Sequence, residues 1–122
     1  MDERTLKVCL DTGHHTYAGA DPVAFLRRHL GRIAYVHFKD VDPAVKARVI
    51  AGRTDFYDAC GQGIFCNFGR GEVVLPAVRQ VLLDADYEGW CTVEQDCDPA
   101  LPGSPAADAR ANRDHLASIG FN

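Results

Sequence analysis

Short runs of apolar residues alternate along the chain with longer stretches in which apolar residues recur at helical spacing. Leu6 to Leu10, Ile33 to Phe38 and Trp90 to Gln95 are rich in β-branched, aromatic and aliphatic residues, a pattern that predicts buried strands. A short strand over Ile64 to Phe68 also fits, inside a stretch interrupted by glycine. The residues Asp11 to Gly13, which follow the first run, predict a loop.

Capping residues and the spacing of apolar side chains predict helices between these strands. Asp21 is a typical N-cap with Pro22 at the first helical position, and Gly31 supplies a stop. After the last strand, the Pro-, Gly- and Ser-rich connector Pro99 to Pro105 leads into a final helix. The predicted helices are Pro22 to Leu30, Pro43 to about Ala51, a turn at Phe56 to Cys60, Val74 to Ala85, and about Ala106 to Ser118.

The resulting order is β-α-β-α-(β)-α-β-α, which is typical of an α/β protein whose parallel strands are joined by helical crossovers. Four βα units are half of a (β/α)₈ TIM barrel, and the 122 residues are about half of the roughly 250 that such a barrel needs. We therefore expect a single half-barrel domain over residues 1–122, with two open strand edges.

Composition narrows the class of protein without identifying it. Hydrophobic residues at 47% and charged residues at 25% are values of a folded globular protein. A net charge of −4 disfavours nucleic acid, because neutralising phosphates requires a basic surface. The five cysteines form no C-x-x-C pair, so neither a disulfide framework nor a zinc ribbon is indicated. No apolar run suits a bilayer and the charged start lacks a signal-peptide core, so we expect a cytoplasmic protein without a membrane partner.

Polar side chains gather on one face of each predicted strand, because alternate residues of a strand share a face. The second strand divides its residues into two sets: Ile33, Tyr35, His37 and Lys39 on one face, and Ala34, Val36 and Phe38 on the other. The first strand likewise places Cys9 with Asp11, and the last places Glu94 with Asp96. Each strand thus becomes polar toward its carboxyl end, where active sites of (β/α) barrels lie.

Asp11, His37 and Glu94 form a candidate cluster of two carboxylates and one imidazole, one from each strand end. Oxygen-rich ligation with one nitrogen suits Mn²⁺, Mg²⁺, Co²⁺ or Zn²⁺. Taken singly, each residue has a simpler explanation: Asp11 as the cap of a turn, His37 as a hydrogen-bonded core histidine, and Glu94 as the partner of a nearby Lys or Arg. Their occurrence together at matching strand ends favours a divalent metal site.

Two further features lie near this cluster. His14 follows the first strand, and Lys39 shares a face with His37, so both are placed to reach a substrate. The turn Gly69-Arg70-Gly71 offers backbone N–H groups to an anion. A G-x-G without a third glycine is a weak dinucleotide fingerprint, however, and a simple loop is the better explanation.

Four segments, in register, resemble one family. They are LDTGH at Leu10 to His14, VHFKD at Val36 to Asp40, GRGEV at Gly69 to Val73, and GWCTVEQD at Gly89 to Asp96. Together they resemble the carboxyl-terminal half of the xylose-isomerase-like (β/α)₈ barrels, and within that family the inosose dehydratases most of all. The resemblance spans nearly the whole chain, including Arg110 to Arg113 in the last helix.

The resemblance implies a metal site of one Asp, one His and two Glu residues, of which Asp11, His37 and Glu94 match three. It also implies catalytic roles for Glu94 and Lys39, and substrate binding by His14, Lys39 and Asp96. The expected metal is Mn²⁺ or Co²⁺, with Mg²⁺ or Zn²⁺ as alternatives. The implied reaction is that of a lyase or isomerase that removes a proton next to the carbonyl of a keto-inositol or keto-sugar.

The sequence departs from the family pattern at three points. The second Glu ligand has no counterpart, because it lies in the amino-terminal half; Arg70 replaces the Glu of a G-E-G turn, and Tyr35 replaces the first His of an H-V-H pattern. We therefore expect an enzyme-derived half-barrel that forms a homo-oligomer or pairs with an amino-terminal half-barrel. The alternative is a catalytically incomplete fragment that acts as a binding or interaction module.

Overall fold

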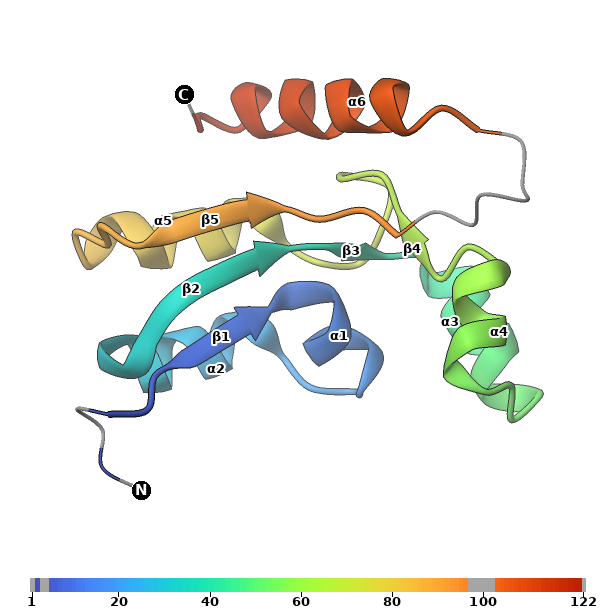
Figure 1. Cartoon of the computed structure of the whole chain (residues 1–122), viewed down its shortest axis with the longest axis horizontal. Helices are drawn as coiled ribbons and strands as arrows, with labels where there is room; N and C mark the ends of the chain where they lie inside the picture. The colour runs from blue at the N-terminus through green and yellow to red at the C-terminus, as the bar shows by residue number, and fades with distance from the viewer. Residues whose placement is uncertain (1, 3–4, 97–102, 122) are drawn as a thin grey trace.

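Three parallel strands form the central sheet of the computed structural model, which describes residues 2, 5–96 and 103–121 (Figure 1). The strand order is β1-β2-β5, and a separate two-stranded sheet pairs β3 with β4 in antiparallel fashion. The strands are β1 (Val8–Asp11), β2 (Ile33–Phe38), β3 (Asp40–Val41), β4 (Phe65–Cys66) and β5 (Trp90–Val93). In the described residues no helix combines the length and the apolar character that crossing a membrane requires.

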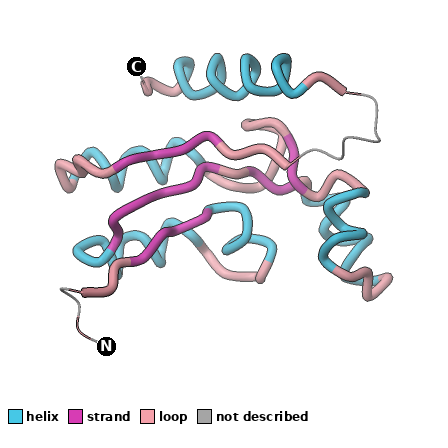
Figure 2. The backbone as a smooth tube through the Cα atoms, viewed as in Figure 1, coloured by secondary structure: helices cyan, strands magenta, loops and turns pink. Residues whose placement is uncertain are grey.

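Helices cover one face of this sheet and its carboxyl end. They are α1 (Thr12–Tyr17), α2 (Pro22–His29), the 3₁₀ turn η1 (Leu30–Arg32), α3 (Pro43–Ala51), α4 (Phe56–Gly61), α5 (Leu75–Asp84) and α6 (Pro105–Ser118). Figure 2 shows α2 and α5 behind the sheet, α3 and α4 beyond its carboxyl end, and α6 along the β5 side. The side chains of Asp21, Asp42 and Ser104 cap α2, α3 and α6, each followed by proline.

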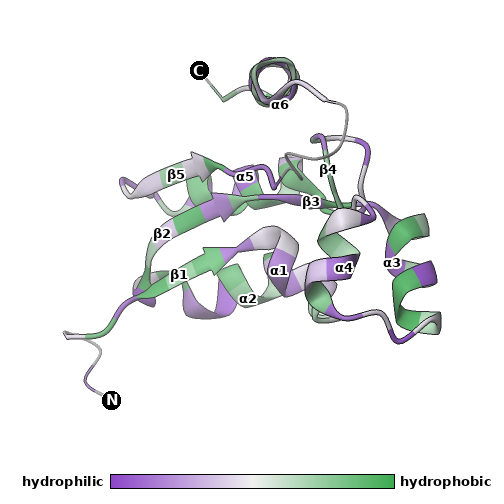
Figure 3. Ribbon diagram, turned by 45° about the vertical axis from the view of Figure 1, so that its right-hand side comes forward, coloured by the Kyte–Doolittle hydropathy of each residue, from purple (hydrophilic) through white to green (hydrophobic). Residues whose placement is uncertain are grey.

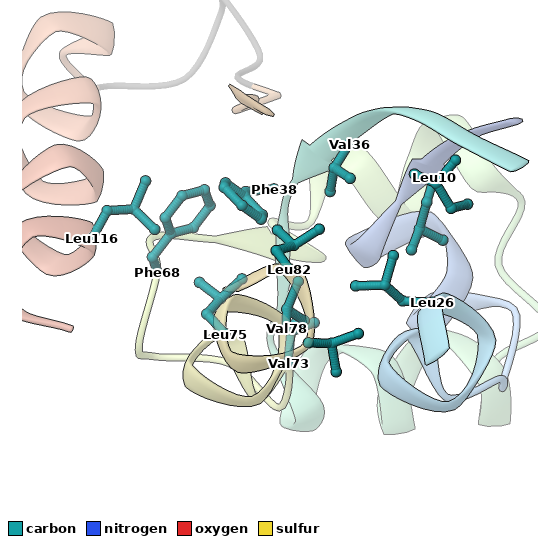
Figure 4. Close-up of a cluster of buried hydrophobic side chains, with 12 residues drawn as sticks. Leu10, Leu26, Val36, Phe38, Phe68, Val73, Leu75, Val78, Leu82 and Leu116 are labelled. Carbon is teal, nitrogen blue, oxygen red and sulfur yellow. The ribbon is translucent and has the colours of Figure 1, made fainter. Parts of the chain in front are cut away.

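The hydrophobic core lies between the sheet and these helices. Strand residues Leu10, Val36 and Phe38 face Leu26 of α2 and Leu82 of α5 (Figure 4). On the other side of Phe38, Phe68 and Leu116 bring the loop after β4 and α6 into the same cluster. The hydrophobic colouring of β1 and β2 gives way to hydrophilic residues near their carboxyl ends (Figure 3), which leaves polar side chains at that edge of the sheet.

The structure confirms the predicted α/β class, with parallel strands joined by helical crossovers. The helix expected at 43–51 has the predicted bounds, and those of α2, α5 and α6 differ by a residue or so. Cys97 and most of the predicted connector from Pro99 lie outside the described residues. The loop predicted after the first strand is wrong: α1 begins at Thr12, because the Asp11 carboxylate accepts the His14 N–H and caps the helix.

Two other predictions need correction. The predicted strand near Ile64 to Phe68 forms as β4, but it pairs antiparallel with β3 outside the central sheet, so the described residues hold three parallel strands rather than four. The face assignment also fails at the start of β2. The pairing shifts between Val8–Ile33 and Cys9–Tyr35, so that Ile33 is buried and Ala34 exposed. A bulge adds one residue there and restores the predicted alternation from Tyr35 onward.

Asp40 organises the loop that follows β4, although the sequence suggested no role for it. Its carboxylate is fully buried and accepts hydrogen bonds from the backbone N–H groups of Val41, Gly69, Gly71 and Val73, at 2.9–3.0 Å. The 69–71 turn therefore does present N–H groups to an anion, and that anion is a side chain of the same chain. A Cβ at Gly71 would lie 2.1 Å from Asp40 Oδ1, which explains the glycine.

We predict that Asp40→Asn lowers the free energy of unfolding by about 3 kcal/mol, because the amide puts N–H groups against backbone donors that are buried. Urea denaturation followed by circular dichroism measures this. Asp84→Asn, at an exposed position bonded only to Gln80 in the described residues, is the control and should change stability by no more than about 0.5 kcal/mol. Equal stability of the two variants would contradict the assigned role of Asp40.

Candidate metal centre

The strand register brings the three predicted ligands together at the carboxyl end of the sheet. Asp11 pairs with His37 across β1 and β2, and His37 pairs with Thr92 across β2 and β5. Glu94 follows β5 and remains tied to the sheet, because its N–H donates to Phe38 O at 3.0 Å. Three adjacent parallel strands therefore deliver the side chains to one place.

The three side chains converge within metal-binding reach of one another. His37 Nδ1 lies 2.5 Å from Glu94 Oε2 and 3.7 Å from Asp11 Oδ2. When one ligand atom is taken from each residue, the three atoms all lie within 4.8 Å of one another. All three side chains are partly buried, so solvent still reaches the group.

Two buried carboxylate oxygens at this centre face imidazole nitrogens. Asp11 Oδ2 lies 2.9 Å from His14 Nδ1 and 3.7 Å from His37 Nδ1, and Glu94 Oε2 lies 2.5 Å from His37 Nδ1. A buried carboxylate oxygen is costly unless a hydrogen-bond donor or a cation compensates for the lost hydration. Because both oxygens are close to His37 Nδ1, the donor set of two oxygens and one nitrogen fits a divalent ion.

Lys39 supplies a buried positive charge beside these ligands. Its side chain is only 1% exposed, and Nζ donates to Glu94 Oε1 at 2.9 Å and to Asp96 Oδ2 at 3.0 Å, with Asp11 Oδ2 at 3.8 Å. Burial lowers the pKa of Lys39, but the hydrogen bonds to Glu94 and Asp96 and the charge of Asp11 outweigh burial and raise it above the ordinary value. The ammonium therefore stays protonated at neutral pH.

The start of α1 makes room for this lysine. The Thr12 hydroxyl donates to Lys39 O at 2.7 Å and accepts the Lys39 N–H at 2.9 Å, which fixes the backbone just after β2. A Cβ at Gly13 would lie 2.5 Å from Lys39 Cγ, so only glycine leaves space for the lysine stem. On the far side, Lys39 Nζ lies 4.5 Å from the centre of the Phe65 ring, a cation–π contact.

His14 lies at the rim of the centre, on α1 rather than on the predicted loop. Its Nδ1 is 2.9 Å from Asp11 Oδ2, and its side chain is 43% exposed. The imidazole packs against the rings of Phe56 and Phe65, with ring centres 5.6 and 5.0 Å away. Side-chain contacts on one side and exposure on the other suit a residue that meets a substrate.

The structure thus brings together all six residues that the sequence singled out: Asp11, His14, His37, Lys39, Glu94 and Asp96. Their proximity is observed, whereas their roles in binding and catalysis remain predictions. Sequence reasoning missed Thr12 and Phe65, which support Lys39. Thr12 sits inside the Asp-Thr-Gly-His segment and offered a signal, but Phe65 comes from a separate sheet and offered none.

Arg70 and Tyr35, which depart from the family pattern, differ in their distance from this centre: Arg70 lies away from it and Tyr35 lies beside it. Arg70 is exposed on the turn held by Asp40 and makes no hydrogen bond to the six residues. Tyr35 is on the same strand as His37, and its ring meets the imidazole edge-on with centres 4.9 Å apart. The Tyr35 hydroxyl hydrogen-bonds to the Thr92 hydroxyl of β5. Tyr35 therefore packs beside the candidate metal centre, next to His37.

Comparisons with known proteins agree with this arrangement. The family model described as xylose isomerase-like TIM barrel matches residues 1–119. The chain is 39% identical over 100 residues to an inosose dehydratase of Geobacillus kaustophilus, and 38% identical over 109 residues to the rhizopine catabolism protein MocC of Rhizobium meliloti. These matches cover 82% and 89% of this chain, but only 32% and 33% of the relatives. The chain therefore spans about a third of the length of the curated relatives it matches.

A solved structure also matches, that of a xylose isomerase-like TIM barrel/4-hydroxyphenylpyruvate dioxygenase fusion protein. The TM-score is 0.59 at 22% identity, over 93% of this chain and 18% of the other. At that identity the match supports the fold alone.

We predict that Lys39→Met lowers the free energy of unfolding at pH 7 by about 3–5 kcal/mol, because Glu94, Asp96 and Asp11 lose their buried cation. Urea denaturation measures the loss. Lys7→Met, at an exposed lysine that donates to Gly31 O, is the control and should cost no more than about 0.5 kcal/mol. A Lys39→Met variant as stable as this control would show that the ammonium is dispensable.

The raised pKa of Lys39 predicts that the stability difference between wild type and Lys39→Met depends on pH. A basic group whose pKa is raised on folding stabilises fully below its unfolded value, here 10.5, and loses that contribution as pH rises through the folded value. The stability gap between wild type and Lys39→Met should thus be constant up to about pH 10.5 and shrink above it. Denaturation of both proteins from pH 7 upward checks this; a gap that narrows well below pH 10.5 would contradict it.

Proposed function

Because the chain belongs to the xylose isomerase-like TIM barrel family, we propose that it carries the metal-binding part of a lyase or isomerase that acts on a keto-inositol or keto-sugar. The observation that supports this most is the convergence of Asp11, His37 and Glu94 from three strand ends, with one ligand atom of each within 4.8 Å of the others.

Asp11, His37 and Glu94 are the residues that would hold a divalent ion, with Mn²⁺ or Co²⁺ the first candidates and Mg²⁺ or Zn²⁺ the alternatives. When bound, such an ion supplies Lewis acidity toward a carbonyl oxygen, which acidifies the adjacent C–H. Glu94 Oε1 is held by Lys39, which leaves Oε2 for the centre. The charges of Asp11, Glu94, Asp96 and Lys39 sum to −2, which a divalent ion neutralises.

Because the Lys39 ammonium stays protonated, Lys39 and Glu94 have different roles in the proposed reaction. A lysine that keeps its proton at neutral pH cannot remove one from a substrate, so proton abstraction next to the carbonyl falls to a carboxylate, and we assign it to Glu94. Lys39 holds Glu94 and Asp96 in place and stabilises negative charge that develops nearby. His14 and Asp96, both with exposed surface, contact the hydroxyl groups of the substrate.

The relatives and this chemistry together support a substrate class. The matched proteins include inosose dehydratases and a rhizopine catabolism protein. A keto-inositol offers the ketone, the acidic C–H and the β-hydroxyl that such a site can use. We therefore place dehydration of a keto-inositol first and isomerisation of a keto-sugar second.

A complete barrel around this centre requires five further βα units. The described residues supply three parallel strands, and β1 and β5 each have one unpaired edge. Trp90 is 80% exposed on β5 and Val93 is 40% exposed, as expected of positions that another part of a barrel covers. Two copies would supply six strands, whereas a barrel of this family type has eight. We therefore favour a partner segment with five βα units, which also carries the fourth ligand, over a homodimer.

We predict that the 122-residue chain binds Mn²⁺ or Co²⁺ with micromolar or weaker affinity, since one ligand is missing, and that Glu94→Gln weakens binding by about tenfold or more. Isothermal titration calorimetry measures both values. Glu88→Gln, at an exposed position, is the matched control and should bind as wild type does. If wild type binds no metal, the chain is better described as the alternative, a catalytically incomplete interaction module.

The proposed completion has its own test. The part of the Geobacillus kaustophilus relative that lies outside the matched region is expressed with this chain, and sedimentation should then give a 1:1 complex with tighter Co²⁺ binding. Dehydration of a keto-inositol, followed by NMR, should appear only in the complex. A chain that sediments as a folded 13.3 kDa monomer and ignores the added segment would contradict the proposal.

A further inference from the structure

The segment that carries Glu94 and Asp96 leaves the sheet before it reaches the metal centre. The last hydrogen bond to β2 is that of the Glu94 N–H to Phe38 O, and β5 itself ends at Val93. Figure 2 shows the chain continuing beyond β5 as a loop. Strand pairing therefore does not fix Gln95 and Asp96, and another contact has to.

Gln95 contacts two other segments: its Nε2 donates to Phe65 O of β4 at 3.5 Å, and its Oε1 makes a shorter bond to helix α6 at 3.0 Å through one buried residue. Asn112 is fully buried, its Oδ1 accepts the Phe68 N–H at 2.9 Å, and its Nδ2 donates to Gln95 Oε1 at 3.0 Å. The side chain thus joins three separate parts of the chain: α6, the loop after β4, and the segment after β5. Burying an amide is favourable only when its donor and acceptor are both used, as they are here.

Successive side chains of the segment after β5 point in alternate directions, so the contact at Gln95 affects its neighbours Glu94 and Asp96. Glu94 and Asp96 both accept hydrogen bonds from Lys39 Nζ, while the residue between them turns toward α6. We infer that Asn112, acting through Gln95, is a positioning residue that holds the Glu94 and Asp96 carboxylates on Lys39 and Glu94 Oε2 at the metal centre. The part of this inference that concerns the metal rests on the proposed function.

Docking of α6 does not itself require the contact with Gln95. Leu116 packs on the same helix against Phe68 in the core (Figure 4), and Asn67 Nδ2 donates to Asp108 Oδ1 at 3.0 Å near its start. The hydrogen bond to Gln95 is the feature that reaches from the helix to the carboxylates.

The experiment removes the link from the Gln95 side, because a change at buried Asn112 risks detaching α6. Gln95→Met keeps the length of the side chain and removes both the acceptor and the Nε2 donor to Phe65 O at 3.5 Å, whereas Gln95→Glu removes that donor and keeps the acceptor. Gln80→Met, at an exposed glutamine of α5 bonded to Asp84, is the matched control. Each variant of the full chain is measured by ¹⁵N NMR of the Lys39 ammonium, which is visible only while that group is held, and by titration with Co²⁺.

Gln95→Met should abolish the Lys39 ammonium signal and weaken Co²⁺ binding about tenfold or more. Gln95→Glu and Gln80→Met should retain the signal and bind no more weakly than wild type. Retention of the signal in Gln95→Met would overturn the inference, whatever its overall stability. If wild type binds no Co²⁺, the metal proposal fails, and the ammonium signal alone still decides whether the link positions the carboxylates.

Discussion

A lysine ammonium that is almost wholly buried dictates the arrangement of the carboxyl end of this sheet. Placing a charge with 1% exposure in a protein interior is very unfavourable unless carboxylates and hydrogen bonds replace its hydration. Lys39 obtains both from the segment after β5 and from Asp11 at the end of β1. Those two segments lie on opposite sides of β2. The contacts that Lys39 makes with them therefore link the carboxyl ends of all three strands.

The Asp-Thr-Gly-His segment serves this arrangement residue by residue. The two oxygens of the Asp11 carboxylate have different partners: Oδ1 caps α1, and Oδ2 faces His14 and His37 at the candidate metal centre. Thr12 fixes the Lys39 backbone, and Gly13 leaves space for the lysine stem. The cap considered as a simple alternative for Asp11, and the lysine partner considered for Glu94, are therefore both present. They coexist with the candidate metal centre because each carboxylate uses one oxygen for these contacts and turns the other toward His37.

The sequence predicted the features that follow from periodicity and from strand direction. Parallel strands end at the same edge, so Asp11, His37 and Glu94 had to be neighbours once the strands were assigned, and the predicted family resemblance is confirmed by the match over residues 1–119. The features it missed arise from tertiary contacts. Nothing local marks Asp40 as the acceptor for a loop some thirty positions away, and the bulge at Ala34 depends on the partner strand. Antiparallel pairing of β4 likewise depends on where β3 lies.

The position of the ligands on the sheet limits how rigid the centre can be. Only His37 lies on a strand paired on both sides; Asp11 ends one edge strand and Glu94 follows the other. An edge strand has half of its backbone groups outside the ladder, so its end is held less firmly than that of a central strand. Lys39 and the Asn112–Gln95 link supply restraint where the ladder stops. In a closed barrel both edges would be paired, and the centre would gain rigidity from the same strands that bury Trp90 and Val93.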